Sequence, residues 1–156
     1  MLHEDQAPSH TAEWSATIQR TVKQRAAVQR EVGRLLDALA PERPPARHDV
    51  PTPAVRQHRA PGRCILQADA RAVTVSWFPA RADADSLGEV VVIAWRGTVS
   101  HPGGATRANG GAEPLDTISL QPVELPDGCW EWRSDRHSPA LGTEDLASYC
   151  RTLLDS

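Results

Sequence analysis

Phenylalanine and tyrosine are nearly absent from this chain of 156 residues, since each occurs once, whereas tryptophan occurs five times. Tryptophan must therefore supply most of the aromatic bulk of any core. Lysine is equally scarce: Lys23 is the one lysine among 17 basic residues. This arginine bias carries no functional weight, because the base composition of a GC-rich genome produces the same bias.

The sequence also lacks the short motifs that mark common catalytic and metal sites. Neither a CxxC pair nor a GxSxG, P-loop or GxGxxG motif occurs, and the glycine-rich stretch 100–111 precedes a strand rather than a helix. Asp135, His137 and Ser138 are neighbours in sequence, but proximity along the chain does not make a triad. We therefore expect no cofactor and no catalytic constellation, although a pocket enzyme stays open.

Cysteine and histidine are too scattered for a zinc site. No two of the cysteines are close in sequence, and no histidine has an acidic partner four residues away on a helix. The residues concerned are Cys64, Cys129, Cys150, His3, His10, His48, His58, His101 and His137. We expect no metal, and we expect Cys64 and Cys129, which begin apolar runs, to be buried and inert.

No stretch approaches the roughly 20 apolar residues that cross a bilayer, and residues 1–6 are acidic, without the apolar core of a signal peptide. The sequence thus predicts a soluble, cytoplasmic protein with reduced thiols. The formal net charge is -3. Residues 1–63 carry 10 basic against 7 acidic residues, and residues 64–156 carry 7 against 13. This basic half is too weakly charged for a nucleic-acid interface, so we expect no such partner.

The stretch 89–96 is the one run of consecutive apolar residues. It is rich in β-branched residues and bounded by Gly88 and Gly97. A run of this kind is typical of a central strand covered on both faces. The other segments can be arranged around it.

Residues 12–40 are predicted to form a long helix that ends at Pro41. Its apolar stripe, which needs a sheet face to lie on, consists of Trp14, Ile18, Thr21, Val28, Val32, Leu36 and Leu39. Arg25 sits within the stripe, and we expect its stem to pack while its head reaches the edge; a buried pairing with a carboxylate is the alternative. The opposite face carries Arg20, Lys23, Arg30 and Arg34, either as a solvated surface or as a docking surface for an acidic partner.

Residues 41–63 hold six prolines and five arginines and are predicted to be an irregular connector. Five strands follow within 64–156, at 64–68, 72–78, 89–99, 116–125 and 129–133, and Thr143 is predicted to N-cap a short C-terminal helix at 144–154. After a frayed segment 1–11, the sequence thus predicts a single α+β domain, 1–156. In it, the long N-terminal helix packs across a curved five-stranded antiparallel meander.

Two functions follow from this architecture. The first is a non-catalytic protein–protein interaction or self-associating adaptor domain, a homodimer included, that uses a strand edge or the basic helix face. The alternative is a small apolar-ligand-binding pocket between helix and sheet. Its lining would be Trp77, Trp95, Trp130 and Trp132, with Arg96 or His101 as polar anchor. We favour core packing for these tryptophans.

Overall fold

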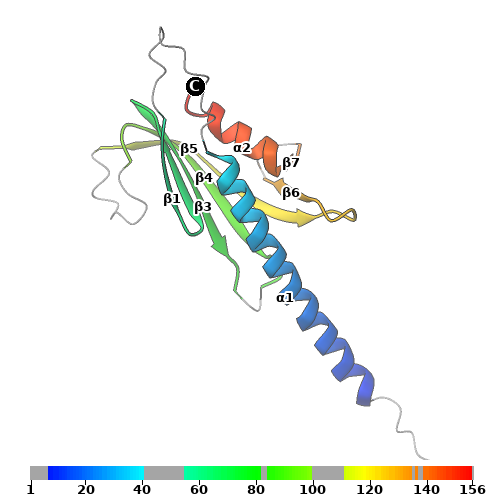
Figure 1. Cartoon of the computed structure of the whole chain (residues 1–156). Helices are drawn as coiled ribbons and strands as arrows, with labels where there is room; N and C mark the ends of the chain where they lie inside the picture. The colour runs from blue at the N-terminus through cyan, green and yellow to red at the C-terminus, as the bar shows by residue number, and fades with distance from the viewer. Residues whose placement is uncertain are drawn as a thin grey trace, which may run out of the picture.

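The computed structural model describes residues 7–40, 55–81, 84–99, 111–134, 136 and 139–155, with side chains from Thr21 onward. It is an α+β fold with two helices and an antiparallel sheet (Figure 1). The elements in chain order are α1 (Ala7–Ala38), β1 (Arg56–Ala60), β2 (Arg63–Gln67), β3 (Arg71–Pro79), β4 (Gly88–Arg96), β5 (Glu113–Glu124), β6 (Trp130–Arg133), β7 (Leu141–Gly142) and α2 (Thr143–Thr152).

The sheet has seven strands, so the prediction of five was wrong. Each strand pairs antiparallel with the next, in the order β1-β2-β3-β4-β5-β6-β7. Five of the strands lie near the predicted positions, and β1 and β7 are additional. β7 is only two residues long and forms because Leu141 pairs with Trp132 of β6, a tertiary contact without a local signal.

The connector predicted at 41–63 is wrong in its last part, because Arg56–Ala60 forms the edge strand β1 and Arg63 begins β2. Prolines are absent from 55–60, and the next one, Pro61, falls in the turn between the two strands. Gly62 adopts a positive φ of 69° there, which suits a tight hairpin. Residues 41–54 lie outside the described residues.

β4 is the middle strand of the sheet, as predicted, but its two faces are not covered equally. Val90, Val92 and Ala94 are buried toward the helices, whereas Val91 and Ile93 are only half-buried on the other face. β4 ends at Arg96 rather than at 99, because Gly97 turns the chain with a φ of 101°. The run of apolar residues therefore reflects one covered face and one partly covered face.

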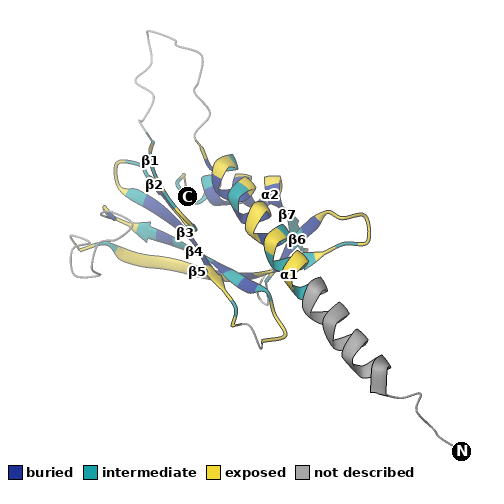
Figure 2. Cartoon of the chain, turned by 60° about the horizontal axis from the view of Figure 1, so that its bottom comes forward, coloured by how far each residue is buried: buried dark blue, intermediate teal, exposed yellow. Residues whose placement is uncertain are grey.

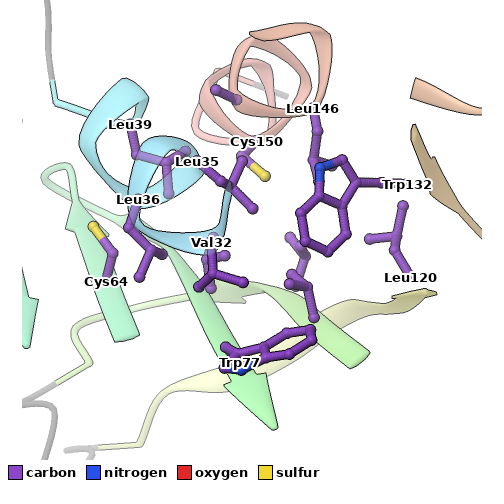
Figure 3. Close-up of a cluster of buried hydrophobic side chains, with 14 of the residues drawn as sticks. Val32, Leu35, Leu36, Leu39, Cys64, Trp77, Leu120, Trp132, Leu146 and Cys150 are labelled. Atoms are coloured by element: carbon purple, nitrogen blue, oxygen red, sulfur yellow. The ribbon is translucent and has the colours of Figure 1, made fainter. Parts of the chain in front are cut away.

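The core lies between the sheet and the two helices, which cover the same face (Figure 3). Leu35, Leu36 and Leu39 at the C-terminal end of α1 meet Leu146 and Cys150 of α2 above the sheet (Figure 3). From the sheet, Trp77 and Trp132 stand edge to face with ring centroids 6.3 Å apart. Tryptophan thus fills the space that phenylalanine fills in other cores.

The part of α1 that packs on the sheet is shorter than predicted. The backbone helix spans Ala7–Ala38 rather than 12–40, and among its described side chains, from Thr21 onward, the first fully buried apolar one is Val28. In the part of the chain that the structure describes, no helix is long and apolar enough to cross a membrane.

Pro122 lies inside β5, beyond the residues of β5 that pair with β4. One further local prediction needs correction. Thr143 is not the N-cap of α2. Gly142 takes that position without a side-chain cap, and the Thr143 hydroxyl points into the core instead.

Candidate functional site

α1 is divided into two parts by how far its apolar stripe is covered. Val28, Val32, Leu35 and Leu39, spaced four, three and four residues apart, are at most 2% exposed against the sheet and α2. Toward the N-terminus, Thr21 and Arg25 continue the same spacing but are only half-buried. Among the described side chains of the stripe, full burial thus begins at Val28, and Thr21 and Arg25 are covered only in part.

The N-terminal half of α1 runs past the end of the sheet (Figure 1). Residues 7–25 span about 27 Å at 1.5 Å per residue. Val22, on the flank of the stripe, is 62% exposed, more than any other large apolar side chain in the described part of the chain. The sequence places Trp14 and Ile18 on the stripe of this projecting half.

An open groove of about 660 Å³ lies where α1 leaves the sheet. Its walls are Thr21, Gln24 and Arg25 of α1, the 84–87 loop and residues 121–124 of β5. Asp85 and Glu124 contribute carboxylates to this wall, and Arg25 is the one cation among the described residues that line it. The groove is therefore a polar recess with an acidic excess.

Arg25 fulfils neither of its two predicted roles completely. Its Nη2 donates a hydrogen bond to the carbonyl oxygen of Arg81 at 2.7 Å, so the head group is held by backbone rather than by a carboxylate. Its Nε is buried without a hydrogen-bond partner. An unsatisfied buried donor of this kind costs roughly 1–3 kcal/mol, which a partner group in the groove would recover.

The predicted basic face of α1 is only partly a free surface. Lys23 and Arg30 are exposed, in agreement with a solvated or docking surface. Arg34 is 66% exposed but pairs with Glu31 one turn before it, at 3.1 Å. The side chain of Arg20 lies outside the described residues.

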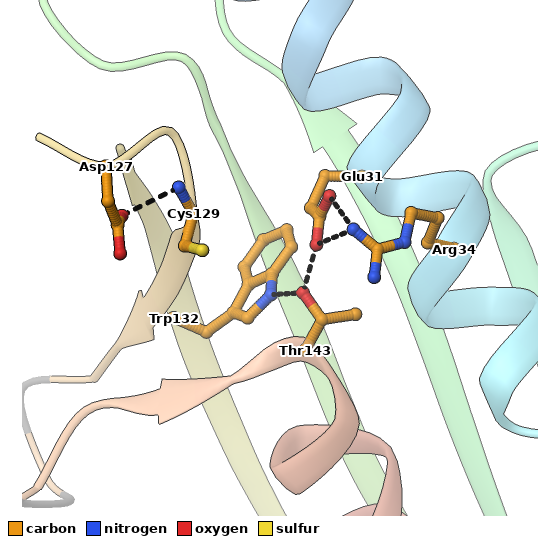
Figure 4. A network of polar contacts seen from close by, with 6 residues as sticks. All are labelled: Glu31, Arg34, Asp127, Cys129, Trp132 and Thr143. Atoms are coloured by element: carbon orange, nitrogen blue, oxygen red, sulfur yellow. Dashed lines mark hydrogen bonds and ion pairs between the residues drawn. The ribbon is translucent and has the colours of Figure 1, made fainter. Parts of the chain in front are cut away.

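A buried network of hydrogen bonds connects α1 to β6 and to the start of α2 (Figure 4). The indole Nε1 of Trp132 donates to the Thr143 hydroxyl at 3.1 Å, and that hydroxyl donates to Glu31 Oε1 at 2.6 Å. The Arg34 guanidinium completes the partners of the Glu31 carboxylate. The Trp132 indole, the Thr143 hydroxyl and the Glu31 carboxylate thus all have partners within this network, which indicates a structural rather than a reactive role.

Glu31, Arg34 and Thr143 of this network also line a smaller groove of about 280 Å³, together with Cys129 and Trp130. This site could not be predicted from the sequence, because residue 31 is about 100 residues from residues 132 and 143 along the chain. The one local signal was Glu31, a carboxylate directly beside the apolar stripe. No group of three potential metal ligands occurs within the described ranges.

The predicted pocket tryptophans are divided between the two faces of the sheet. Trp77, Trp130 and Trp132 belong to the core cluster under the helices. Trp95 lies on the opposite face, where its Nε1 donates to the Thr74 hydroxyl at 3.0 Å.

The two predicted polar anchors do not join these tryptophans. Arg96 is 65% exposed and pairs with Glu113, and His101 lies outside the described residues. Neither groove described above is walled by more than one of the four tryptophans.

The open edge of β5 is protected against pairing. Only residues 121–124 of β5 pair with β6, and no described strand covers the outer side of residues 113–119 (Figure 2). This edge carries Pro114, an irregular register at Leu115, and Asp116, whose carboxylate accepts the N–H of Thr117 at 2.9 Å. Proline, a bulge and a capped N–H are the features by which natural sheets prevent edge-to-edge association.

None of the three thiols is activated as a nucleophile. Burial raises the pKa of Cys64, and burial together with the nearby Cys64 raises the pKa of Cys150 to about 12. Cys129 is exposed, contrary to prediction, because it follows the 126–128 turn; the neighbouring Asp127 carboxylate raises the pKa of its thiol.

Comparisons with protein-family models, with curated proteins and with solved structures found no match.

Proposed function

We propose that this protein is a non-catalytic interaction module that binds a protein partner through the projecting N-terminal half of α1. The observation that carries the proposal is that the helical backbone of α1 runs past the end of the sheet, where the sequence continues the apolar stripe with Trp14 and Ile18. Val22, beside the stripe, is 62% exposed, whereas Val28 is 2% exposed.

The low stability expected of an unpacked helix supports this proposal. An isolated helix is marginal in water unless an apolar face packs against something. Trp14 and Ile18 stand on the stripe of a segment that the sheet does not reach. A partner that covers this stripe would stabilise the segment and remove about 0.8 kcal/mol of cost for each CH₂ group that it shields from water.

Two other features support helix-mediated binding rather than pairing between the sheet edges of two copies. The open edge of β5 is protected as described above, and Arg56 and Arg59 on β1 place positive charge at the opposite edge. Lys23 and Arg30 remain exposed on the outer face of α1, where they would favour a partner with acidic groups.

The test compares two single substitutions on α1 in the full chain. Ile18→Asp places a charge on the stripe, and Ala26→Asp places the same charge on an exposed position far around the helix from the stripe. Both variants should melt cooperatively like the native protein, because the covered core begins at Val28. Only Ile18→Asp should abolish association, measured by light scattering and by capture of a partner on immobilised protein.

A native protein that has the mass of one 17.0 kDa chain and captures no partner would overturn the proposal. Equal association of the native protein and Ile18→Asp would also overturn it.

A further inference from the structure

We infer that the outer edge of β1 is a second docking site, at which an extended acidic segment of a partner protein adds a strand to the sheet. This contact is separate from α1 and goes beyond the proposed function. Three features support it: the outward backbone groups of β1, the regular backbone of this edge and its positive charge.

The outward backbone groups follow from how β1 pairs with β2. β1 is the end strand of the sheet and has β2 as its one neighbour among the described strands (Figure 1). A two-residue turn joins the two strands, so Ala60 and Arg63 exchange both backbone hydrogen bonds. Because bonded and non-bonded pairs alternate along an antiparallel ladder, Gln57 and Arg59 direct their N–H and C=O groups away from β2. No described residue bonds to these four groups, so the edge offers two donors and two acceptors to an added strand.

The backbone of β1 lacks the features that block the open edge of β5. That edge carries Pro114, an irregular register at Leu115 and the Asp116 carboxylate, which accepts the N–H of Thr117. Residues 56–60 contain no proline, and all five pair with β2 in regular register. Of these two described edges, β1 is therefore the one whose backbone can accept another strand.

The charge of β1 selects the kind of strand. The hairpin 55–68 contains three arginines, His58 and no carboxylate, although the whole chain has a formal net charge of -3. Arg56 is exposed and forms no ion pair with a described carboxylate. Two β1 edges would repel each other, whereas a strand that carries carboxylates would be attracted. The charge that protects this edge against a second copy thus favours an acidic segment of another protein.

The two arginines of β1 point to opposite faces of the sheet, which specifies where the partner carries its carboxylates. Arg59 lies on the helix side, where it pairs with Asp37 at 3.5 Å. Arg56, three residues earlier, lies on the other side because side chains alternate along a strand. The Asp37 carboxylate is 78% exposed, so this surface pair leaves Arg59 accessible to a further carboxylate. The segment that fits this edge therefore has acidic side chains on both of its faces.

Titration of the full chain with a fluorescent peptide of threonine and glutamate, with glutamate on both faces, tests the strand addition by anisotropy. Gln57→Pro deletes one outward N–H and no bond to β2, a change that an edge strand tolerates. Gln57→Ala is the matched control, because it loses the same side chain and keeps the N–H. Both variants should melt cooperatively. Gln57→Pro should weaken binding about tenfold, the loss expected for one hydrogen bond, and Gln57→Ala should not.

The charge is tested separately with a peptide in which lysine replaces glutamate and with Arg56→Glu. The lysine peptide should not bind the native protein, and Arg56→Glu should bind the glutamate peptide about tenfold more weakly. The lysine peptide makes this test independent of any effect of a substitution on folding. Ile18→Asp should bind the glutamate peptide like the native protein, because α1 takes no part in this contact.

The outcomes separate this inference from the proposed function. Absence of saturable binding of the glutamate peptide, or equal binding of the lysine peptide, would overturn the inference. Equal binding to Gln57→Pro and Gln57→Ala would show attraction by charge without an added strand and would also overturn it. Tighter binding of a single-stranded DNA oligonucleotide than of the glutamate peptide would identify a nucleic acid as the partner instead. Peptide binding as predicted, with no partner captured through α1, would support the inference and overturn the proposed function alone.

Discussion

The hydroxyl of Thr143 is the point at which α1 is fastened to the C-terminal part of the fold, so its removal should destabilise the protein strongly. Thr143→Val keeps the shape of the side chain and deletes the group that accepts from Trp132 at 3.1 Å and donates to Glu31 at 2.6 Å. Thr143 and Glu31 are 6% and 8% exposed, so water cannot replace the lost partner freely.

The expected loss follows from the two hydrogen bonds. The indole N–H would be left buried without an acceptor, a cost of about 1–3 kcal/mol. The Glu31 carboxylate would lose one donor but keep Arg34, so it adds about 1 kcal/mol or less. We therefore expect the free energy of unfolding to fall by roughly 1–4 kcal/mol, a sizeable share of the 5–15 kcal/mol typical of a domain.

Urea denaturation followed by tryptophan fluorescence measures this loss as a shift of the midpoint at unchanged slope. Thr152→Val on the exposed side of the same helix is the matched control and should change the stability by less than about 0.5 kcal/mol. If Thr143→Val were as stable as the control, the Trp132–Thr143–Glu31 network would not contribute to stability.

Two glycines should respond in opposite ways to alanine. In Gly88→Ala the new Cβ would lie 2.5 Å from the Phe78 carbonyl oxygen at a φ of +141°, so thermal denaturation should show a loss above about 2 kcal/mol. Gly33→Ala on α1 meets nothing within 4 Å and should gain about 0.5–1 kcal/mol; a loss there would contradict the helix assignment. Burial raises the pKa of Cys150 from 9.0 to about 12, so above pH 9 the unfolded chain loses this proton first. Stability should therefore fall between pH 9 and 12, by up to about 1.4 kcal/mol per pH unit from this group. Cys150→Ala should flatten that fall, and an unchanged slope would show that Cys150 does not cause it.

The sequence predicted the parts of the fold whose signals are local. The valine-rich run at 89–96 is β4, the Asp69-Ala70 pair is the turn between β2 and β3, and residues 144–154 correspond to α2 within two residues. β1 was not predicted, because its residues are polar or charged apart from Ala60 and give no apolar pattern. β7 was not predicted, because its two residues form a strand only by pairing with β6.

The candidate site was predictable only in part. The helical stripe and the exposed cations of α1 followed from periodicity alone. The point at which the sheet stops covering the stripe did not, because it depends on how the ends of the strands lie under the helix. The role of Thr143 was likewise hidden, since a threonine before a helix normally indicates an N-cap and its actual partners are 11 and 112 residues away.

Hydrogen exchange along α1 in the native protein and in Ile18→Asp tests the central claim most directly. Residues 28–38 should exchange slowly in both proteins, because the sheet and α2 cover this part. Residues 11–25 should exchange slowly only in the native protein bound to its partner, which covers them. Fast exchange of residues 11–25 in that complex, or equal protection in Ile18→Asp, would contradict the claim that this half of α1 is an interaction surface.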